Sequence, residues 1–356
     1  MASPTRLLIA ASGTGGHLFP AIALAQQLPD YEVEWLGTAS RLETSLVPEE
    51  YPLNIIPVEG FQQKFSLKTL KIISNFMSSI WQTQKLIKEH QIDAVFTTGG
   101  YIAAPAILAA RWQKKPVIIH ESNYIPGKVT KFFSRWCDAV GLGFAGTSQY
   151  LPQTETVHVS TPVRSQFLTP QPLGLNIPDD GMMILVVGGS QGAVAVNQLV
   201  RAAAPAWFEL GAYVVHLTGK NDSDAHSLKH PQYIPLPFSD NMAGLLQRAN
   251  LAISRAGAGT ITELAVTGTP AVLIPYPYAA EDHQTYNAQE YKDAGAGIVY
   301  QQSQLTVDRL QEQVAQLLRS PEQLQQMADK AQALGVKDIV QRLASLVRNL
   351  INLSSG

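Results

Sequence analysis

The stretch LLIAASGTGG, residues 7–16, is an apolar run that ends in small residues, and it decides the fold. The stretch ILVVGGSQGA, residues 184–193, repeats this pattern half a chain length away. In both, residues of strand character lead into a glycine-rich turn and a helical pattern, which predicts the first strand, loop and helix of a Rossmann-like half. We therefore expect an α/β protein with two Rossmann-like domains, whose mostly parallel sheets face a central cleft.

Glycine-rich turns of this kind favour an anionic ligand such as a nucleotide diphosphate. They let backbone N–H groups approach the ligand, and the following helix adds the positive end of its dipole. Gly99-Gly100 repeats the arrangement between an apolar strand and a helical run. The first loop matches the dinucleotide fingerprint only loosely, because the strand near residues 33–38 does not end in an acidic residue. For any one loop, a tight turn without a ligand is the alternative.

The composition is typical of a two-domain protein without general affinity for nucleic acid. The 356 residues are 46% hydrophobic, enough for two cores, and the formal net charge of −2 does not attract phosphate polymers. The single cysteine, Cys137, cannot form an internal disulfide, which fits a reducing cytoplasm. The N-terminal apolar run is too short for a signal peptide, and no segment approaches the roughly 20 apolar residues of a membrane span.

Strand and helix patterns alternate along both halves of the chain. Strands are expected at residues 6–11, 32–36, 53–58, 93–97, 116–120 and 138–142, and again at 182–187, 212–217, 233–236, 250–253, 270–274 and 297–299. Residues 306–351 are expected to be helical with few breaks. Prolines 162, 170, 172 and 178 interrupt the helix and strand periodicity of the apolar residues and mark a linker between the two halves. We place an N-terminal domain at 1–163, a C-terminal domain at 164–337, and a last helix at 338–356 that packs back on the N-terminal domain.

Two polar phrases in the second half indicate contacts to a sugar nucleotide. Glu263 lies about one turn into a helix opened by the glycines at 257 and 259, where a carboxylate can accept hydrogen bonds from both ribose hydroxyls. Gln284 and Asn287 share one face at the start of another helix, and paired amides suit sugar hydroxyls. A capping-box partner and a solvated helix start are the respective alternatives.

These motifs occur together, and in the same order, in one known family. The set is Gly13-Thr14-Gly15-Gly16-His17, Gly99-Gly100-Tyr101, His120-Glu121-Ser122-Asn123, Pro162-Val163-Arg164, Gly188 to Ala193, Ser254 to Glu263, and Gln284 with Asn287. Over nearly its whole length the chain resembles the MurG family of bacterial N-acetylglucosaminyltransferases. The resemblance implies a GT-B fold and inverting transfer of N-acetylglucosamine from UDP-N-acetylglucosamine to the C4 hydroxyl of the N-acetylmuramyl unit of lipid I. The products would be lipid II and UDP, in a pathway that serves peptidoglycan synthesis, cell shape and cell division.

The resemblance also implies the roles of individual residues. The donor would meet Arg164, Ser190 and Gln191 at its diphosphate, Phe238 at its uracil, Glu263 at its ribose, and Gln284 with Asn287 at its sugar. The first domain would take the acceptor, undecaprenyl-pyrophosphoryl-MurNAc-pentapeptide, through Thr14, Gly15, Gly16, Gly100, Tyr101 and Asn123. His17, Glu121 and Asn123 would lie at the reacting centre.

Attack by a hydroxyl requires a base, and His17 and Glu121 are the two candidates. An imidazole exchanges protons near neutral pH, although a structural or helix-capping histidine is the alternative for His17. No metal or cofactor is expected, because no clear Asp-x-Asp motif occurs in the expected place. Fixed N–H dipoles and Arg164 can stabilise the departing UDP instead.

Three positions depart from the family pattern. The family usually has glutamine at Ser122, Gly-Asn at Ser160-Thr161, and glutamine at Leu217. These departures concern acceptor details and leave the nucleotide site largely unchanged.

Residues 61–86 combine lysines with an apolar stripe. Lys64, Lys68 and Lys71 lie among apolar residues from Phe65 to Trp81, which predicts reversible binding to an anionic bilayer. A core-facing helix with solvated lysines is the alternative. The expected location is the cytoplasmic face of the bacterial plasma membrane, as a peripheral protein, with other proteins of cell-wall synthesis as candidate partners.

Two other classes of function remain open at this point. One is a related GT-B transferase that adds a sugar to diacylglycerol. The other is a user of UDP-sugars without an acceptor, either a UDP-N-acetylglucosamine epimerase or a non-catalytic binding subunit. An assay without acceptor separates the epimerase from a transferase.

Overall fold

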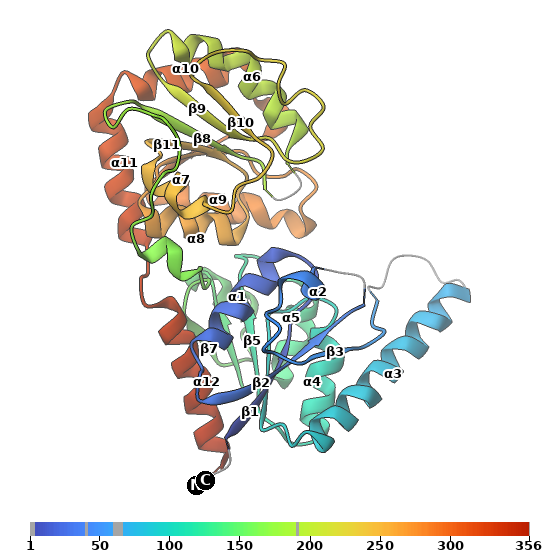
Figure 1. The fold of residues 1–356 in the computed structure, drawn as a ribbon. Coiled ribbons are helices and arrows are strands. Elements are labelled where there is room, and N and C mark those ends of the chain that lie inside the picture. Colours follow the sequence, from blue (N-terminus) through green and yellow to red (C-terminus); the bar gives the residue numbers. More distant parts are fainter. Residues whose placement is uncertain (1–3, 40–41, 60–66, 190–191, 356) are drawn as a thin grey trace. The chain divides into compact units, whose positions relative to one another are not determined.

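The computed structural model describes residues 4–39, 42–59, 67–189 and 192–355 (Figure 1). The chain forms two compact units, one of Met1–Arg164 with Asp338–Gly356 and one of Ser165–Lys337, which we call unit 1 and unit 2. Within the described ranges, no helix is both long and apolar enough to cross a bilayer.

Unit 1 contains a seven-stranded sheet in the order β3-β2-β1-β4-β5-β6-β7, with every neighbouring pair parallel. The strands are β1 Thr5–Ala10, β2 Tyr31–Gly37, β3 Leu53–Ile55, β4 Ala94–Thr97, β5 Val117–Glu121, β6 Ala139–Leu142 and β7 Thr156–His158. Its helices are α1 Gly15–Gln26, α2 Glu43–Leu46, α3 Leu67–Glu89, α4 Ala103–Trp112, α5 Lys128–Phe133 and α12 Ile339–Ser355, with short 3₁₀ turns at η1 Ser134–Trp136 and η2 Ala145–Tyr150.

Both faces of this sheet are buried, as expected for parallel strands covered by helices. Leu7 and Ile9 of β1 pack in one core with residues of α1 and α12, and Leu8 of the same strand packs in the other core with residues of α4. Figure 1 shows α12 beside α1 on the first of these faces. The last helix therefore contributes to the core of unit 1.

Unit 2 contains a six-stranded parallel sheet in the order β10-β9-β8-β11-β12-β13. The strands are β8 Met183–Val187, β9 Tyr213–Leu217, β10 Tyr233–Leu236, β11 Leu251–Ser254, β12 Ala271–Leu273 and β13 Gly297–Val299. Its helices are α6 Val194–Phe208, α7 Met242–Arg248, α8 Ala258–Thr267, α9 His283–Asp293, α10 Val307–Leu318 and α11 Pro321–Leu334, with 3₁₀ turns at η3 Ser165–Leu168, η4 Ala280–Asp282 and η5 Gln302–Gln304.

The strand order explains where ligands can bind. In each unit the first strand lies between the second and the fourth, so the order reverses between β1 and β4 and again between β8 and β11. Loops at the carboxyl ends of the strands diverge at such a switch point and leave a crevice. Three of the glycine loops singled out in the sequence, after β1, β4 and β8, follow strands that flank these points. The α/β class with two Rossmann-type sheets is confirmed.

The sequence missed some details of the elements. The strand expected at 53–58 covers only Leu53–Ile55, and β7 was not expected. β7 has three residues at the edge of the sheet, too few for a clear alternation of apolar and polar residues. The helical region expected at 306–351 is three helices, α10, α11 and α12.

Candidate functional site

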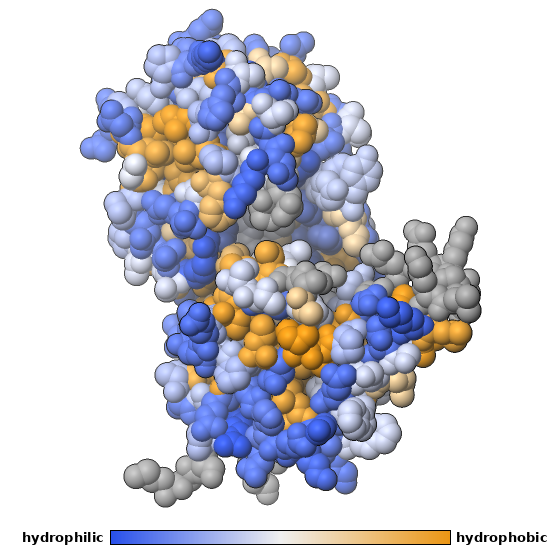
Figure 2. All heavy atoms as spheres, turned by 45° about the vertical axis from the view of Figure 1, so that its right-hand side comes forward, coloured by the Kyte–Doolittle hydropathy of each residue, from blue (hydrophilic) through white to orange (hydrophobic). Residues whose placement is uncertain are grey.

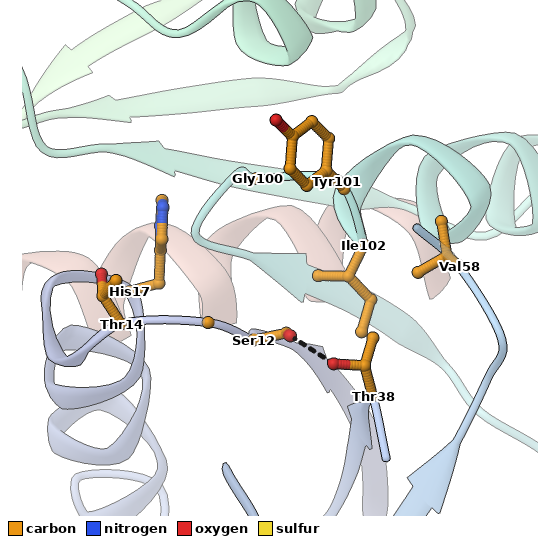
Figure 3. Close-up of a pocket in the computed structure, with 9 residues that line it drawn as sticks. Ser12, Thr14, His17, Thr38, Val58, Gly100, Tyr101 and Ile102 are labelled. Atoms are coloured by element: carbon orange, nitrogen blue, oxygen red, sulfur yellow. Dashed lines mark hydrogen bonds between the residues drawn. The ribbon is translucent and has the colours of Figure 1, made fainter. Parts of the chain in front are cut away.

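A cavity of about 140 Å³ lies at the switch point of unit 1 (Figure 3). It is lined by Ser12, Gly13, Thr14, His17, Thr38, Val58, Gly100, Tyr101 and Ile102. These residues come from the loop after β1, the start of α1, the end of β2, the segment after β3 and the loop after β4. The glycine loops that follow β1 and β4 therefore meet around one pocket.

His17, in the first turn of α1, is oriented as a proton acceptor. Its Nδ1 lies 2.7 Å from the carbonyl oxygen of Thr98, and because a carbonyl only accepts, Nδ1 carries the proton. In the neutral ring the lone pair is then on Nε2. A Cβ built at Gly100 would lie 3.7 Å from this Nε2, so glycine leaves open the space in front of it. In Figure 3 the side chains of His17 and Tyr101 project in the same direction.

The N-terminus of α1 offers donors to an anion. Thr14, its N-cap residue, is extended and makes no side-chain cap, and the first turn contains no acidic residue. The first N–H groups of a helix have no partner within it, so those of this turn can meet a phosphate. A Cβ at Gly15 would lie 2.7 Å from the ring of Phe19, so a larger residue here would require that ring to shift.

Glu121 is buried and supports a loop. Its two oxygens accept hydrogen bonds from the N–H groups of Asn123 and Gly127, each at 3.0 Å, and the side-chain amide of Asn123 lies 3.4 Å from Oε1. Both carboxylate oxygens are therefore engaged by the loop that joins β5 to α5. Of the two candidate bases, His17 is the one with an accessible lone pair.

Two of the family departures meet at one buried histidine. His120 is fully buried, its Nε2 lies 2.9 Å from the carbonyl oxygen of Ser160, and its Nδ1 lies 3.3 Å from Oγ of Ser122. Burial lowers the pKa of His120 to about 4, so the ring is neutral at pH 7. Ser122 and Ser160, far apart in the sequence, therefore fix the tautomer of one ring.

In unit 2 the loop after β8 lies against a buried polar network. Ser190 and Gln191 fall outside the described residues, but a Cβ at Gly192 would lie 2.5 Å from the carbonyl oxygen of Thr218, which explains its glycine. The same oxygen accepts a hydrogen bond of 2.8 Å from Asn197 in α6.

The network continues behind this loop. Asp222 is bound by Arg201 at 2.7 Å and by Asn197 at 2.6 Å, and the fully buried His216 bonds Asn197 and Tyr233. Burial lowers the pKa of His216 to about 3. Asp222-Ser223-Asp224 has Asp-x-Asp spacing, yet Asp222 is committed to Arg201. In the described part of the chain, no three His, Cys, Asp or Glu side chains are grouped as metal ligands.

Gln284 and Asn287 both hold the loop after β11. Oε1 of Gln284 accepts hydrogen bonds from the N–H groups of Ala256, at 3.1 Å, and Tyr276, at 2.9 Å. Asn287 is fully buried and donates to the carbonyl oxygen of Ala256 at 3.2 Å. Asn287 therefore contacts this loop, and its expected contact with the sugar stays a prediction. Periodicity placed the two amides on one face but carried no information on burial.

Glu263, Phe238 and Arg164, the other residues expected at the donor, differ in burial and in their neighbours. Glu263 is half-buried in α8, whose N-cap is Gly257 and lacks a side-chain cap, so the capping-box alternative is wrong. Phe238 is 55% exposed, with Nζ of Lys220 5.8 Å from its ring centre. Arg164 ends the first of the two segments that form unit 1, and its guanidinium lies 5.0 Å from the ring centre of Phe19.

Family models and similar proteins match both units of this chain. Residues 7–142 match the glycosyltransferase family 28 N-terminal domain, and residues 183–343 match the glycosyltransferase family 28 C-terminal domain. A protein of Gloeothece citriformis (strain PCC 7424) is 66% identical over 98% of this chain and 96% of its own length. A protein of Synechocystis sp. (strain PCC 6803) is 60% identical over 99% of this chain and 100% of its own length. Both are named UDP-N-acetylglucosamine–N-acetylmuramyl-(pentapeptide) pyrophosphoryl-undecaprenol N-acetylglucosamine transferase.

Solved structures are similar over the whole chain. The crystal structure of Acinetobacter baumannii MurG has a TM-score of 0.80 at 31% identity and covers 97% of this chain and 100% of that one. The structure of a putative UDP-N-acetylglucosamine 2-epimerase from Listeria monocytogenes has a TM-score of 0.68 at 14% identity and covers 97% of this chain and 96% of that one. At this identity the likeness shows a common fold alone.

Proposed function

The chain belongs to the MurG family within glycosyltransferase family 28, and from this premise we propose how its own residues carry out the transfer. It is a UDP-N-acetylglucosamine-dependent N-acetylglucosaminyltransferase of peptidoglycan synthesis, as its 60–66% identical relatives are named. Its acceptor is lipid I. The diacylglycerol transferase and the epimerase are not favoured, because identity of this level extends over nearly the whole chain, whereas the epimerase shares only the fold.

The observation that carries the catalytic proposal is the hydrogen bond from His17 to the carbonyl oxygen of Thr98. It leaves Nε2 as the lone-pair nitrogen beside the pocket of unit 1. We assign His17 as the base: Nε2 takes the proton of the C4 hydroxyl while that oxygen bonds to C1 of N-acetylglucosamine. The bond from C1 to the UDP oxygen breaks in the same step, with inversion at C1.

The acceptor diphosphate is assigned to unit 1. Thr14, Gly15 and Gly16 supply N–H groups at the start of α1, and Gly100 and Tyr101 lie across the pocket. Asn123 is held by Glu121 in the loop after β5, which supports a role for that pair in shaping the acceptor site.

The donor is assigned to unit 2. The loop of residues 188–193 precedes α6, and its N–H groups suit a diphosphate, with Ser190 and Gln191 as the proposed contacts. The exposed ring of Phe238 suits stacking on uracil, and the half-buried Glu263 suits the ribose hydroxyls. Gln284 is proposed at the sugar through the loop that it shares with Ala256. Arg164 is proposed as the charge at the donor diphosphate.

Docking on an anionic membrane is supported by α3. Leu70, Ile73, Met77 and Trp81 follow a helical spacing and are 44–66% exposed, while Ile80 and Ile87 of the same helix are buried. The helix is thus core-facing on one side and apolar toward solvent on the other. Figure 2, which brings this side of unit 1 forward, shows hydrophobic side chains at the surface.

Basic residues border this exposed face. Lys71, Lys85 and Lys88 are exposed on the same helix, which suits anionic headgroups. Lys64 lies outside the described residues, and the structure does not describe the side chain of Lys68. Docking at the cytoplasmic face would bring the active site to an acceptor whose polyprenyl tail stays in the bilayer.

One assay tests the proposed reaction. UDP release is measured with UDP-N-acetylglucosamine alone and together with a short-chain lipid I analogue. We expect release only with the analogue, and a disaccharide product. Conversion of the donor without acceptor would indicate an epimerase, and release with a diacylglycerol acceptor instead would reassign the acceptor class.

A further inference from the structure

A buried carboxylate stands directly behind the first glycine loop. Glu43, the first residue of α2, has no exposed surface. Its Oε1 accepts hydrogen bonds from Oγ of Ser12 at 2.7 Å and from N and Oγ1 of Thr38 at 2.7 and 2.8 Å, and its Oε2 accepts one from N of Gly13 at 3.2 Å. Four donors from two separate loops thus converge on one side chain.

This carboxylate is an internal anion. Burial alone would raise the pKa of Glu43, but the hydrogen bonds from Ser12 and Thr38 outweigh burial and hold the pKa below its ordinary value. Gly37 makes room for the side chain, since a Cβ there would lie 2.9 Å from Cγ of Glu43. The end of β2 and the start of α2 are therefore built around a charged group.

All the donors to Glu43 belong to residues that line the pocket, namely Ser12, Gly13 and Thr38. Figure 3 shows the hydroxyl groups of Ser12 and Thr38 facing each other at this pocket, with their oxygens 3.0 Å apart. Here the same bonds that satisfy the buried charge also fix the shape of the cavity.

We propose that Glu43 is the positioning residue of the acceptor pocket. It binds the N–H group of Gly13 and the hydroxyl of Ser12, so these donors point inward and are not offered to the ligand. The N–H groups of Thr14 to Gly16, one step further along, are left to meet the phosphate of the acceptor. This inference rests on the proposed function for the identity of the acceptor, and it assigns Glu43 a role in acceptor binding and none in donor binding.

The test is Glu43→Gln, with Glu34→Gln as the matched control. Glu34 is a carboxylate of β2 that binds His90 at 2.7 Å and does not line the pocket. Glutamine at 43 places a donor where acceptors are needed, so we expect the KM for a short-chain lipid I analogue to rise about tenfold or more, as for a lost charge-assisted hydrogen bond. The Kd for UDP should stay within about twofold in both variants, and the KM should be unchanged in the control. Glu43→Asp, which keeps the charge, should be affected less than Glu43→Gln.

A folded Glu43→Gln enzyme with an unchanged acceptor KM overturns the proposal. If that variant does not fold, Ser12→Ala removes one bond while Glu43 remains, and an unchanged acceptor KM in it has the same meaning. Amide hydrogen exchange gives a readout that needs no turnover: exchange at Gly13 and Thr38 should be about tenfold faster in Glu43→Gln than in wild type, and unaltered in Glu34→Gln. If wild type releases no UDP with the lipid I analogue, the proposed function fails, and the exchange rates alone then decide whether Glu43 positions the loop.

Discussion

His17 and His120 lie in the same unit, and their surroundings give them different chemistry. His17 is half-buried and binds a carbonyl through one nitrogen, so the other nitrogen is available to a substrate. His120 is fully buried, and both of its nitrogens are engaged, by Ser160 and Ser122. A base needs an accessible lone pair, and of these two rings only His17 offers one.

Replacement of His17 distinguishes a base from a structural histidine. We expect His17→Ala and His17→Asn to lower kcat by about 10²–10⁴, since both lose the Nε2 lone pair. Asparagine retains a donor near the Nδ1 position, so it can preserve the bond to Thr98. Steady-state kinetics with a soluble acceptor, and calorimetry with UDP as the folding control, make the measurement. The assignment fails if the folded asparagine variant keeps more than about a third of wild-type kcat.

Replacement of Glu263 tests its proposed contact with the donor. If it accepts hydrogen bonds from the ribose, Glu263→Ala should weaken UDP binding by about 1.5–3 kcal/mol, or roughly 10- to 150-fold. Calorimetry on the folded variant measures the change. Glu312→Ala, which removes an exposed glutamate from α10 of the same unit, is the matched control and should bind UDP like wild type. Equal affinities in the two variants would exclude Glu263 from the donor site.

At the residue scale the sequence could reveal chemistry but not burial. Motif and spacing singled out His17 and the glycines at the pocket of unit 1. They also predicted Asn287 at a sugar but could not show that it is fully buried and donates to the carbonyl oxygen of Ala256. Glu43 was missed because two of its partners, Ser12 and Gly13, lie about thirty residues away and its role depends on how the loops fold over it. The sequence feature that could have indicated Glu43 is the pair Gly37-Thr38 a few residues before it.

At the scale of elements, the structure adds the order of the strands in each sheet, which the sequence did not predict. Alternating patterns predicted the strands and their parallel pairing, yet the sequence does not state which strands are neighbours. The reversal between β1 and β4 brings the loops of Gly13 and Gly100, about ninety residues apart, to one cavity. Short edge strands such as β7 have too few residues for a pattern and are found only by their backbone pairing.

Helix α3 carries the prediction about the membrane. Replacing the exposed Met77 and Trp81 by serine removes apolar surface, and replacing Lys71 by glutamine removes about 1 kcal/mol of attraction to anionic lipid. We expect vesicle sedimentation to fall about tenfold or more in the triple variant, and to respond to salt and to anionic lipid fraction in wild type. Turnover of a soluble short-chain acceptor should hardly change.

A matched control keeps this test specific. Leu334 and Leu353 are also exposed, in α11 and α12, and serine at both removes a similar kind of apolar surface elsewhere in the chain. This control should sediment like wild type. If the α3 variant sediments equally well, or if binding is indifferent to anionic lipid, α3 is not the docking surface.

At the scale of the whole molecule, each unit contains one fully buried neutral histidine, His120 in unit 1 and His216 in unit 2. Burial depresses the pKa of both rings, to about 4 and about 3, below the ordinary value of 6.5. The unfolded chain therefore binds protons that the folded chain does not as the pH falls below 6.5. Stability from these rings is fully present above that pH and is lost as the pH falls toward 4.

The pH dependence of stability tests this assignment. Between pH 6.5 and 4 the shift at His120 corresponds to about 3 kcal/mol of lost stability, and His120→Gln should remove this part of the slope, since glutamine does not titrate. Urea unfolding across this pH range measures the slope, whatever constant loss the variant shows at neutral pH. His226→Gln, at an exposed position of unit 2, serves as the control and should keep the wild-type slope. Because glutamine at 120 removes one titrating ring and leaves His216 in place, the variant should retain part of the acid sensitivity. A slope equal to that of wild type would mean that His120 gains its proton in the folded state, and that its bonds to Ser122 and Ser160 do not hold the ring neutral.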